Sequence, residues 1–257
     1  MSAWFQTFGA VERPLARLFC FPHAGGAPAA FRLWPQSVPA RVQVVGVQLP
    51  GRGSRLREAP LASVPELTAR LAAELGPQLD LPYVFFGHSM GAVLALEAAH
   101  ALASAGQRLP SHVFLSGRRP PHLPRTESDL HTLTDDEFLA QLGARYGGIP
   151  AEVLRERELL ALLLPALRAD IEALETFHVD ASPPLSCALT AYGGDDDPLV
   201  TLEQLRAWRQ YTRGAFRVRQ FRGGHFYLQE RRAEIAAEIS AVLSALIAPA
   251  APGQMFA

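Results

Sequence analysis

The chain has 257 residues, with 24 Lys and Arg against 25 Asp and Glu, so its formal net charge is −1 at pH 7. This balance excludes an overall positive field that would attract nucleic acid or an anionic membrane surface. No apolar run approaches the roughly 20 residues that cross a membrane, and the first residues lack the pattern of a signal peptide. We therefore expect a cytoplasmic monomer that binds neither nucleic acid nor membranes.

Six short apolar runs, mostly separated by helix-like segments, predict an α/β fold. Such alternation is typical of a parallel sheet with helices on both faces. The length suits one unit, so we expect residues 1–257 to form a single domain around a mostly parallel central sheet. The predicted strands are 18–21, 42–49, 83–86, 113–116, 187–192 and 216–221, and the predicted helices are 30–36, 64–79, 90–105, 201–211 and 229–246.

A glycine-rich turn, FPHAGG at residues 21–26, follows the first predicted strand. At the carboxyl end of a parallel strand, such a turn places backbone N–H groups where ligands bind. Beside a serine nucleophile, the N–H of Ala24 would be a candidate donor to the oxyanion of a tetrahedral intermediate. The alternative is a plain turn into the next helix.

The sequence GHSMG at residues 87–91 matches the pattern G-x-S-x-G between a predicted strand and a predicted helix. This is the setting of a nucleophile elbow, in which a strained turn exposes the serine oxygen and small neighbours let strand and helix approach closely. We therefore predict that Ser89 is the nucleophile and that the N–H of Met90 is the other oxyanion donor. The alternative is an idle serine in a tight turn.

A long insertion separates the fourth and fifth predicted strands. Thr134 and Glu137 have the spacing of a capping box, and Leu160, Leu163, Leu164, Leu167, Ile171 and Leu174 recur at helical spacing. Pro165 should kink or split that second helix. We interpret residues from about 120 to 182 as a helical lid, with 134–180 more mobile than the sheet; the alternative is a set of helices packed on the sheet edge.

A serine hydroxyl needs a general base, and a carboxylate should orient that base. His225 is the candidate base, because it lies in a glycine turn after the last predicted strand; the alternative is an ordinary loop histidine. The chain order Ser, Asp, His is that of the α/β-hydrolases, so we expect that fold.

The candidate acid lies in GGDDDP at residues 193–198, after the preceding predicted strand. The spacing Gly194-x-x-Asp197, with Pro198 fixing the turn behind it, favours Asp197. Asp196 has the same spacing from Gly193 and remains the rival. Asp195 would cap or solvate the loop.

No metal-ligand spacing and no nucleotide-binding glycine motif occurs in the chain. We therefore expect neither a metal nor a cofactor. Cys20 and Cys187 each lie in an apolar run and are interpreted as reduced, buried thiols.

Taken together, the motifs resemble those of the type II thioesterases encoded with nonribosomal peptide and polyketide synthases. The resemblance covers residues from about 18 to the last predicted helix. The strings that carry it are FPHAGG, LPGRGSRL, GHSMGA, LSGRRPP, DDEFLAQL, LLLPALRADIEALETF, GGDDDPL and GGHFYL. One departure is His23, where an aromatic Tyr is expected more often.

The resemblance implies hydrolysis of acyl thioesters on the phosphopantetheine arm of carrier domains, which removes aberrant or stalled acyl groups. By motif, it implies the triad Ser89, Asp197 and His225, with the amides of Ala24 and Met90 as the oxyanion hole. Arg118, Arg119 and Arg125 would meet an acidic carrier domain or the phosphate of the arm, unless they are only solvated. Chain release, general esterase activity and a non-catalytic binding role are the alternatives.

Overall fold

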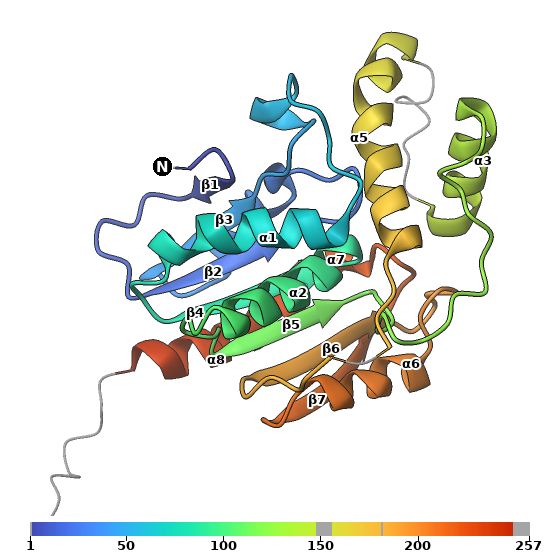
Figure 1. The fold of residues 1–257 in the computed structure, drawn as a ribbon. Coiled ribbons are helices and arrows are strands. Elements are labelled where there is room, and N and C mark those ends of the chain that lie inside the picture. The colour runs from blue at the N-terminus through green and yellow to red at the C-terminus, as the bar shows by residue number, and fades with distance from the viewer. Residues whose placement is uncertain (1, 148–155, 181, 249–257) are drawn as a thin grey trace, which may run out of the picture.

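The computed structural model describes residues 2–147, 156–180 and 182–248, and a seven-stranded sheet forms its centre (Figure 1). The strand order is β1-β3-β2-β4-β5-β6-β7. β1 pairs antiparallel with β3, whereas the other pairings are parallel. The strands are β1 (Phe5–Phe8), β2 (Ala16–Phe21), β3 (Val42–Val47), β4 (Tyr83–His88), β5 (His112–Ser116), β6 (Ala188–Gly194) and β7 (Phe216–Phe221).

The six predicted strands are confirmed to within two residues at each end, but the sequence interpretation missed β1. This strand has four residues and lies at the sheet edge, where it pairs only with β3. A segment this short carries too little periodicity to be distinguished from an irregular terminus.

Helices cover both faces of the sheet, as predicted. Neighbouring residues of one strand point to opposite faces, so Phe19 belongs to one apolar cluster and Leu18 to the other. The Phe19 side is covered by α1 (Val64–Leu75), α2 (Met90–Ser104) and α6 (Leu202–Ala207). The Leu18 side is covered by η1 (Pro28–Phe31), η2 (Trp34–Gln36), α7 (Tyr227–Glu230) and α8 (Arg232–Ile247).

Four predicted helices are wrong in detail. The segment 30–36 forms the short 3₁₀ helices η1 and η2, each with a proline in its first turn, in place of one α-helix. The segment 201–211 divides into α6 and the 3₁₀ helix η5 (Trp208–Tyr211), and 229–246 divides into α7 and α8. The segment 64–79 likewise divides into α1 and the 3₁₀ helix η4 (Gly76–Gln78), and a further 3₁₀ turn, η3 (Gly53–Arg55), lies in a connection.

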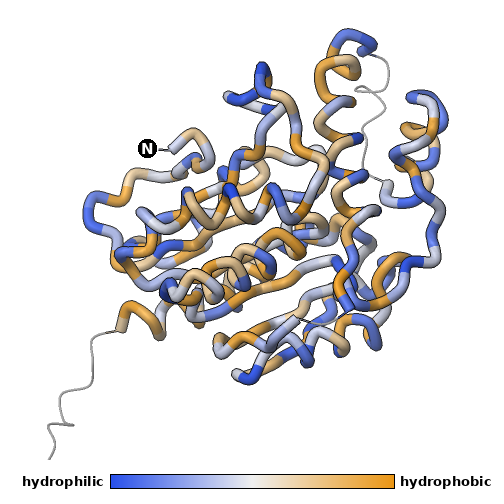
Figure 2. Tube along the Cα trace, in the orientation of Figure 1, coloured by the Kyte–Doolittle hydropathy of each residue, from blue (hydrophilic) through white to orange (hydrophobic). Residues whose placement is uncertain are grey.

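The insertion between β5 and β6 contains α3 (Asp135–Tyr146) and α5 (Arg157–Thr176). Both helices stand beyond the carboxyl ends of the parallel strands (Figure 1), and Figure 2 shows hydrophobic residues recurring along α5. The predicted capping box of Thr134 and Glu137 begins α3. Residues 148–155 and 181 of the predicted lid lie outside the described residues.

Of the two outcomes predicted at Pro165, a kink or a split, the split is wrong, because α5 is one helix from Arg157 to Thr176. Pro165 and Ala161, whose carbonyl loses its helical partner, are both exposed, so water can bind that carbonyl. Cys20 and Cys187 are free and buried, as predicted. No described helix is long and apolar enough to cross a membrane.

Candidate active site

Ser89 lies in the turn between β4 and α2 with φ of 53°, the one positive φ at a non-glycine residue in the described part of the chain. Its N–H donates to the Ser116 carbonyl at 2.7 Å, which ties the turn to β5. A Cβ on Gly87 would lie 2.0 Å from the Gly91 carbonyl oxygen, and one on Gly91 would lie 2.0 Å from the Phe21 carbonyl oxygen. Both glycines are therefore required for this strand-to-helix approach, which matches the predicted elbow.

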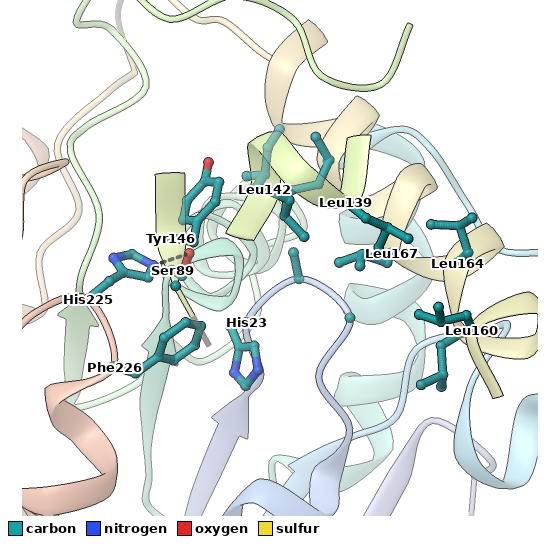
Figure 3. A pocket seen from close by; sticks show the side chains of 16 residues that line it. His23, Ser89, Leu139, Leu142, Tyr146, Leu160, Leu164, Leu167, His225 and Phe226 are labelled. Atoms are coloured by element: carbon teal, nitrogen blue, oxygen red, sulfur yellow. Dashed lines mark hydrogen bonds between the residues drawn. The ribbon is translucent and has the colours of Figure 1, made fainter. Parts of the chain in front are cut away.

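The structure brings Ser89, His225 and Asp197 into one hydrogen-bonded chain. His225 Nδ1 donates to Asp197 Oδ2 at 2.9 Å, so its Nε2 is left to accept the Ser89 hydroxyl proton, with Oγ 3.1 Å away (Figure 3). All three residues are buried: Ser89 is 4% exposed, His225 is 6% exposed and Asp197 is 8% exposed. This geometry suits a serine that is activated by an oriented imidazole.

The backbone between β6 and β7 places Asp197, and not Asp196, against the imidazole. The N–H of Asp196 donates to Gly223 O at 3.1 Å, while its side chain points to solvent. Asp195 Oδ1 accepts the Gly223 N–H at 2.8 Å, so this residue caps the histidine loop. Asp197 Oδ1 accepts the N–H of Leu199 at 3.0 Å, which fixes the carboxylate for His225.

The two predicted oxyanion donors are the N–H of Met90, which directly follows Ser89 in the chain, and the N–H of Ala24, a residue that lines the same pocket as Ser89. Met90 is the first residue of α2, where helical N–H groups have no partner within the helix. Neither N–H donates to any group in the part of the chain that the structure describes. Both are therefore available to an oxyanion beside Ser89.

An apolar pocket of about 230 Å³ opens from Ser89 toward α3 and α5. All six apolar residues that were singled out by their helical spacing in α5 line this pocket, together with Leu139 and Leu142 of α3 (Figure 3). Ala24, His23 and Phe226 line it from the sheet side. The pocket offers an aliphatic surface next to the serine oxygen.

Comparison with known proteins shows the family to which the chain belongs. A family model described as "Thioesterase domain" matches residues 16–243. The chain belongs to the thioesterase family. It is 35% identical to the gramicidin S biosynthesis protein GrsT of Aneurinibacillus migulanus over 97% of both chains. It is 38% identical to the thioesterase PikA5 of Streptomyces venezuelae, over 92% of this chain and 84% of that protein.

Solved structures agree with the sequence relatives. The type II thioesterase BorB from the borrelidin biosynthetic cluster has a TM-score of 0.83 at 36% identity, with 94% of this chain and 96% of that chain covered. The type II thioesterase YbtT from the yersiniabactin pathway has a TM-score of 0.81 at 32% identity, with 95% and 98% covered. The predicted α/β-hydrolase fold and the resemblance to type II thioesterases are therefore confirmed.

Two further imidazoles of the thioesterase lie near His225 and stay neutral. Burial, followed by the charges of His225 and Arg52, lowers the pKa of His23 to about 4. Burial also lowers the pKa of His88 well below its usual value. At pH 7 neither ring carries a positive charge, so neither opposes a proton on His225.

Sequence reasoning missed Tyr146, Ser116 and Tyr227 around the triad. Tyr146 ends α3 with its ring centroid 5.4 Å from that of His225, and His88 Nδ1 lies 2.9 Å from Ser116 Oγ, which in turn lies 2.5 Å from the hydroxyl of Tyr227. The capping box predicts a helix that begins near residue 134, and so the sequence could place Tyr146 near the end of that helix. The position of Tyr146 over His225 had no signal, because it depends on how α3 packs.

The three arginines of the thioesterase that were expected to meet a carrier domain have contacts within the chain. Arg119 pairs with Glu127 at 3.0 Å, and Arg125 pairs with Asp129 at 2.8 Å. Burial lowers the pKa of Arg118, which also bonds to Tyr146. The structure therefore favours an internal role for these side chains over either solvation or a free docking surface.

One cluster of the thioesterase could geometrically hold a metal ion. Ligand atoms of Asp129, His131 and Glu175 lie within 4.8 Å of one another. Glu175 already accepts the N–H groups of Leu130 and His131, and it lies within ion-pair distance of Arg125 and Arg145. Because its negative charge is already balanced, this cluster is a structural brace between α5 and the segment before α3.

Proposed function

We propose that this thioesterase hydrolyses acyl thioesters on the phosphopantetheine arm of carrier domains, and so removes aberrant or stalled acyl groups from a nonribosomal peptide or polyketide synthase. The observation that carries the proposal is the Ser89–His225 contact of 3.1 Å at the wall of an apolar pocket. The relatives support it, because YbtT is described as a type II thioesterase of a nonribosomal peptide and polyketide pathway, and BorB as a type II thioesterase from a biosynthetic cluster.

In the acylation step, Ser89 Oγ attacks the thioester carbonyl while its proton moves to His225 Nε2. The N–H groups of Ala24 and Met90 donate to the resulting oxyanion. The C–S bond then breaks, and the imidazolium protonates the departing sulfur. A thiol, with a pKa of about 8.5, is a better leaving group than an alcohol.

Deacylation repeats the sequence with water. His225 Nε2 takes a proton from a water molecule whose oxygen attacks the acyl-enzyme, and it then returns that proton to Ser89 Oγ as the free acid forms. Asp197 holds the ring in the tautomer that keeps Nε2 free, and it stabilises the imidazolium. Protein groups and water account for each step, so we propose no cofactor and no metal.

The walls of the pocket define the class of acyl group. Leucines and Ile171 from α3 and α5 are half of the lining residues, and no described lining residue carries an acidic or arginine side chain. An aliphatic acyl chain therefore gains from burial, whereas a charged one would be desolvated without a partner. In this proposal α3 and α5 act as a lid over the acyl chain.

The experiment presents the purified protein with a panel of acyl carrier domains, acyl-pantetheine thioesters and simple esters. We expect kcat on carrier thioesters to fall by about 10³-fold or more in Ser89→Ala. Ser104→Ala, at the exposed end of α2, is the matched control and should match the wild type. Full turnover by Ser89→Ala would show that the nucleophile is another group. Faster turnover of simple esters than of every carrier thioester would exclude the editing function.

A further inference from the structure

Asp170 is a fully buried carboxylate in α5 that contacts the loop carrying the oxyanion amide. Its Oδ2 accepts the N–H of Gly25 at 2.7 Å, and Gly25 directly follows Ala24. Leu167, one helical turn earlier in α5, also meets this loop, because a Cβ on Gly25 would lie 2.8 Å from Leu167 Cδ1. One face of α5 therefore seats directly on the turn between β2 and η1.

Arg52 completes this contact from a third part of the chain. Its Nη2 donates to Asp170 Oδ1 at 2.7 Å, and its Nη1 donates to Asp170 Oδ2, so the pair is bidentate. Nη1 also lies 3.5 Å from Gly26 O, and the Arg52 side chain is only 4% exposed. The guanidinium and the carboxylate together hold the turn at Gly25 and Gly26.

Within the turn itself, few other contacts hold the backbone in place. Gly25 has φ of +72°, in the left-handed region, and the N–H of Gly26 donates back to His23 O at 2.8 Å. Without Asp170, the Gly25 N–H would lose the side-chain acceptor that it has in the folded chain. The peptide plane that precedes it, which carries the Ala24 N–H, would then be free to rotate.

We propose that Asp170 is a positioning residue, which fixes the Ala24 amide for the oxyanion through the Gly25 N–H and so makes the oxyanion hole depend on the seating of α5. This inference rests on the proposed hydrolysis of thioesters by Ser89. Its consequence is that acyl transfer is fast only while α5 is seated against the turn. Asp170 touches no reacting atom.

Two ligands separate oxyanion binding from pocket binding. The first is an alkyl trifluoromethyl ketone attached to pantetheine, which forms a tetrahedral adduct with a serine and places a negative oxygen at the amides. The second is the matched thioether with CH₂ in place of the carbonyl, which fills the pocket but has no such oxygen. Wild-type protein should bind the ketone at least ~100-fold more tightly, as expected of a transition-state analogue.

Two variants separate positioning from stability. In Arg52→Met/Asp170→Leu, apolar side chains replace a buried ion pair, a change that proteins often tolerate. We expect near wild-type thermal stability, loss of ketone affinity and kcat by about 10-fold or more, and thioether affinity and KM within about 3-fold. Asp170→Asn keeps one oxygen for Gly25 but leaves Arg52 uncompensated, so it should be less stable while it binds the ketone within about 3-fold of wild type.

Asp135→Asn is the control, because Asp135 links α3 to Arg168 of α5 without touching the turn. Both ligands should bind it as they bind the wild type. Wild-type ketone affinity in the double variant, or equal loss of both ligands, would overturn the positioning role. If the wild type itself binds the ketone and the thioether equally, the proposed function fails, and this inference fails with it.

Discussion

The two sides of the pocket are held by different kinds of contact. On the sheet side, backbone groups define the geometry: Ser89 N–H binds Ser116 O, and a Cβ on Gly194 would lie 2.2 Å from Gly223 O. On the helical side, side-chain ion pairs attach α3 and α5, as in the pair of Arg168 with Asp135. Backbone contacts tolerate changes of neighbouring side chains but no added Cβ, whereas ion pairs can be altered one residue at a time. The catalytic geometry should therefore be rigid on one side and adjustable on the other.

The largest expected effect separates two adjacent aspartates on the sheet side. Asp197→Asn keeps the shape of the side chain but permits the wrong tautomer of His225, so kcat should fall by about 10⁴-fold. Asp196→Asn should stay within about 3-fold, because its side chain is exposed and its contact to Gly223 uses the backbone. Steady-state kinetics on a carrier thioester measures both. A greater loss in Asp196→Asn would reverse the assignment of the acid.

This pair of aspartates shows what local sequence could and could not predict. The elbow was predictable, because the pattern G-x-S-x-G lies between a predicted strand and a predicted helix, although the contact that requires Gly91 is with the Phe21 carbonyl of the neighbouring β2. The acid was narrowed to Asp197 or Asp196, since both have suitable spacing from a glycine. The choice depends on the bond of Asp196 N–H to Gly223 O, which joins two loops that are distant in sequence.

The helical side was predictable in its pattern but not in its attachment. The leucine spacing of α5 was recognised, and those leucines line the pocket. Asp170 looks from sequence like a solvent-facing residue of that helix, because charged residues are rarely buried. Its partner Arg52 lies 118 positions away, and no local pattern connects the two.

The second-largest effect is expected when a single methyl group is added on the sheet side of the pocket, where backbone contacts define the geometry. Gly91→Ala places a Cβ 2.0 Å from the Phe21 carbonyl oxygen, so β2 and α2 must separate. We expect a loss of about 4 kcal/mol in the free energy of unfolding, or failure to fold. Chemical denaturation measures it, and wild-type stability would contradict the close approach.

The matched control for Gly91 is a helical glycine on the other side of the pocket. A Cβ on Gly143 of α3 meets no atom within 4 Å. Gly143→Ala should therefore raise the free energy of unfolding by about 0.5–1 kcal/mol through helix propensity alone. Replacement of glycine by alanine should thus lower the free energy of unfolding on the sheet side and raise it on the helical side.

An intermediate effect is expected where side chains hold the helices. Glu175 is 6% exposed and accepts the Leu130 N–H at 2.9 Å, with Arg125 and Arg145 within ion-pair distance. Glu175→Gln leaves Arg145 without this counter-charge and leaves Arg125 with Asp129 alone, so it should cost about 3 kcal/mol. Asp129→Asn, where the side chain is 53% exposed, should cost under about 1 kcal/mol. Hydrogen exchange should rise in α3 and α5 of Glu175→Gln, and an equal rise across the sheet would refute a local brace.

The smallest expected effect concerns how the sheet responds to acid. His112 begins β5, at the end of the strand away from Ser89, and burial lowers its pKa to about 4. In the unfolded chain the pKa of His112 has its ordinary value of about 6.5. The unfolded chain therefore binds this proton first as the pH falls. The contribution of neutral His112 is thus full above about pH 6.5 and is lost toward pH 4. By pH 4.5 this loss amounts to about 2 kcal/mol in the free energy of unfolding.

His112→Phe should therefore lose about 2 kcal/mol less than wild type between pH 7 and pH 4.5, in denaturant titrations at the two values. The lost bond to Thr190 Oγ1 shifts the stability at both pH values and cancels in the difference. His178→Gln, where the side chain is 54% exposed, is the control for removal of a histidine at the surface. An unchanged pH dependence in His112→Phe would mean that this ring is protonated in the folded protein. Acid would then weaken the sheet through other groups, of which His88 is the most deeply buried imidazole near the triad.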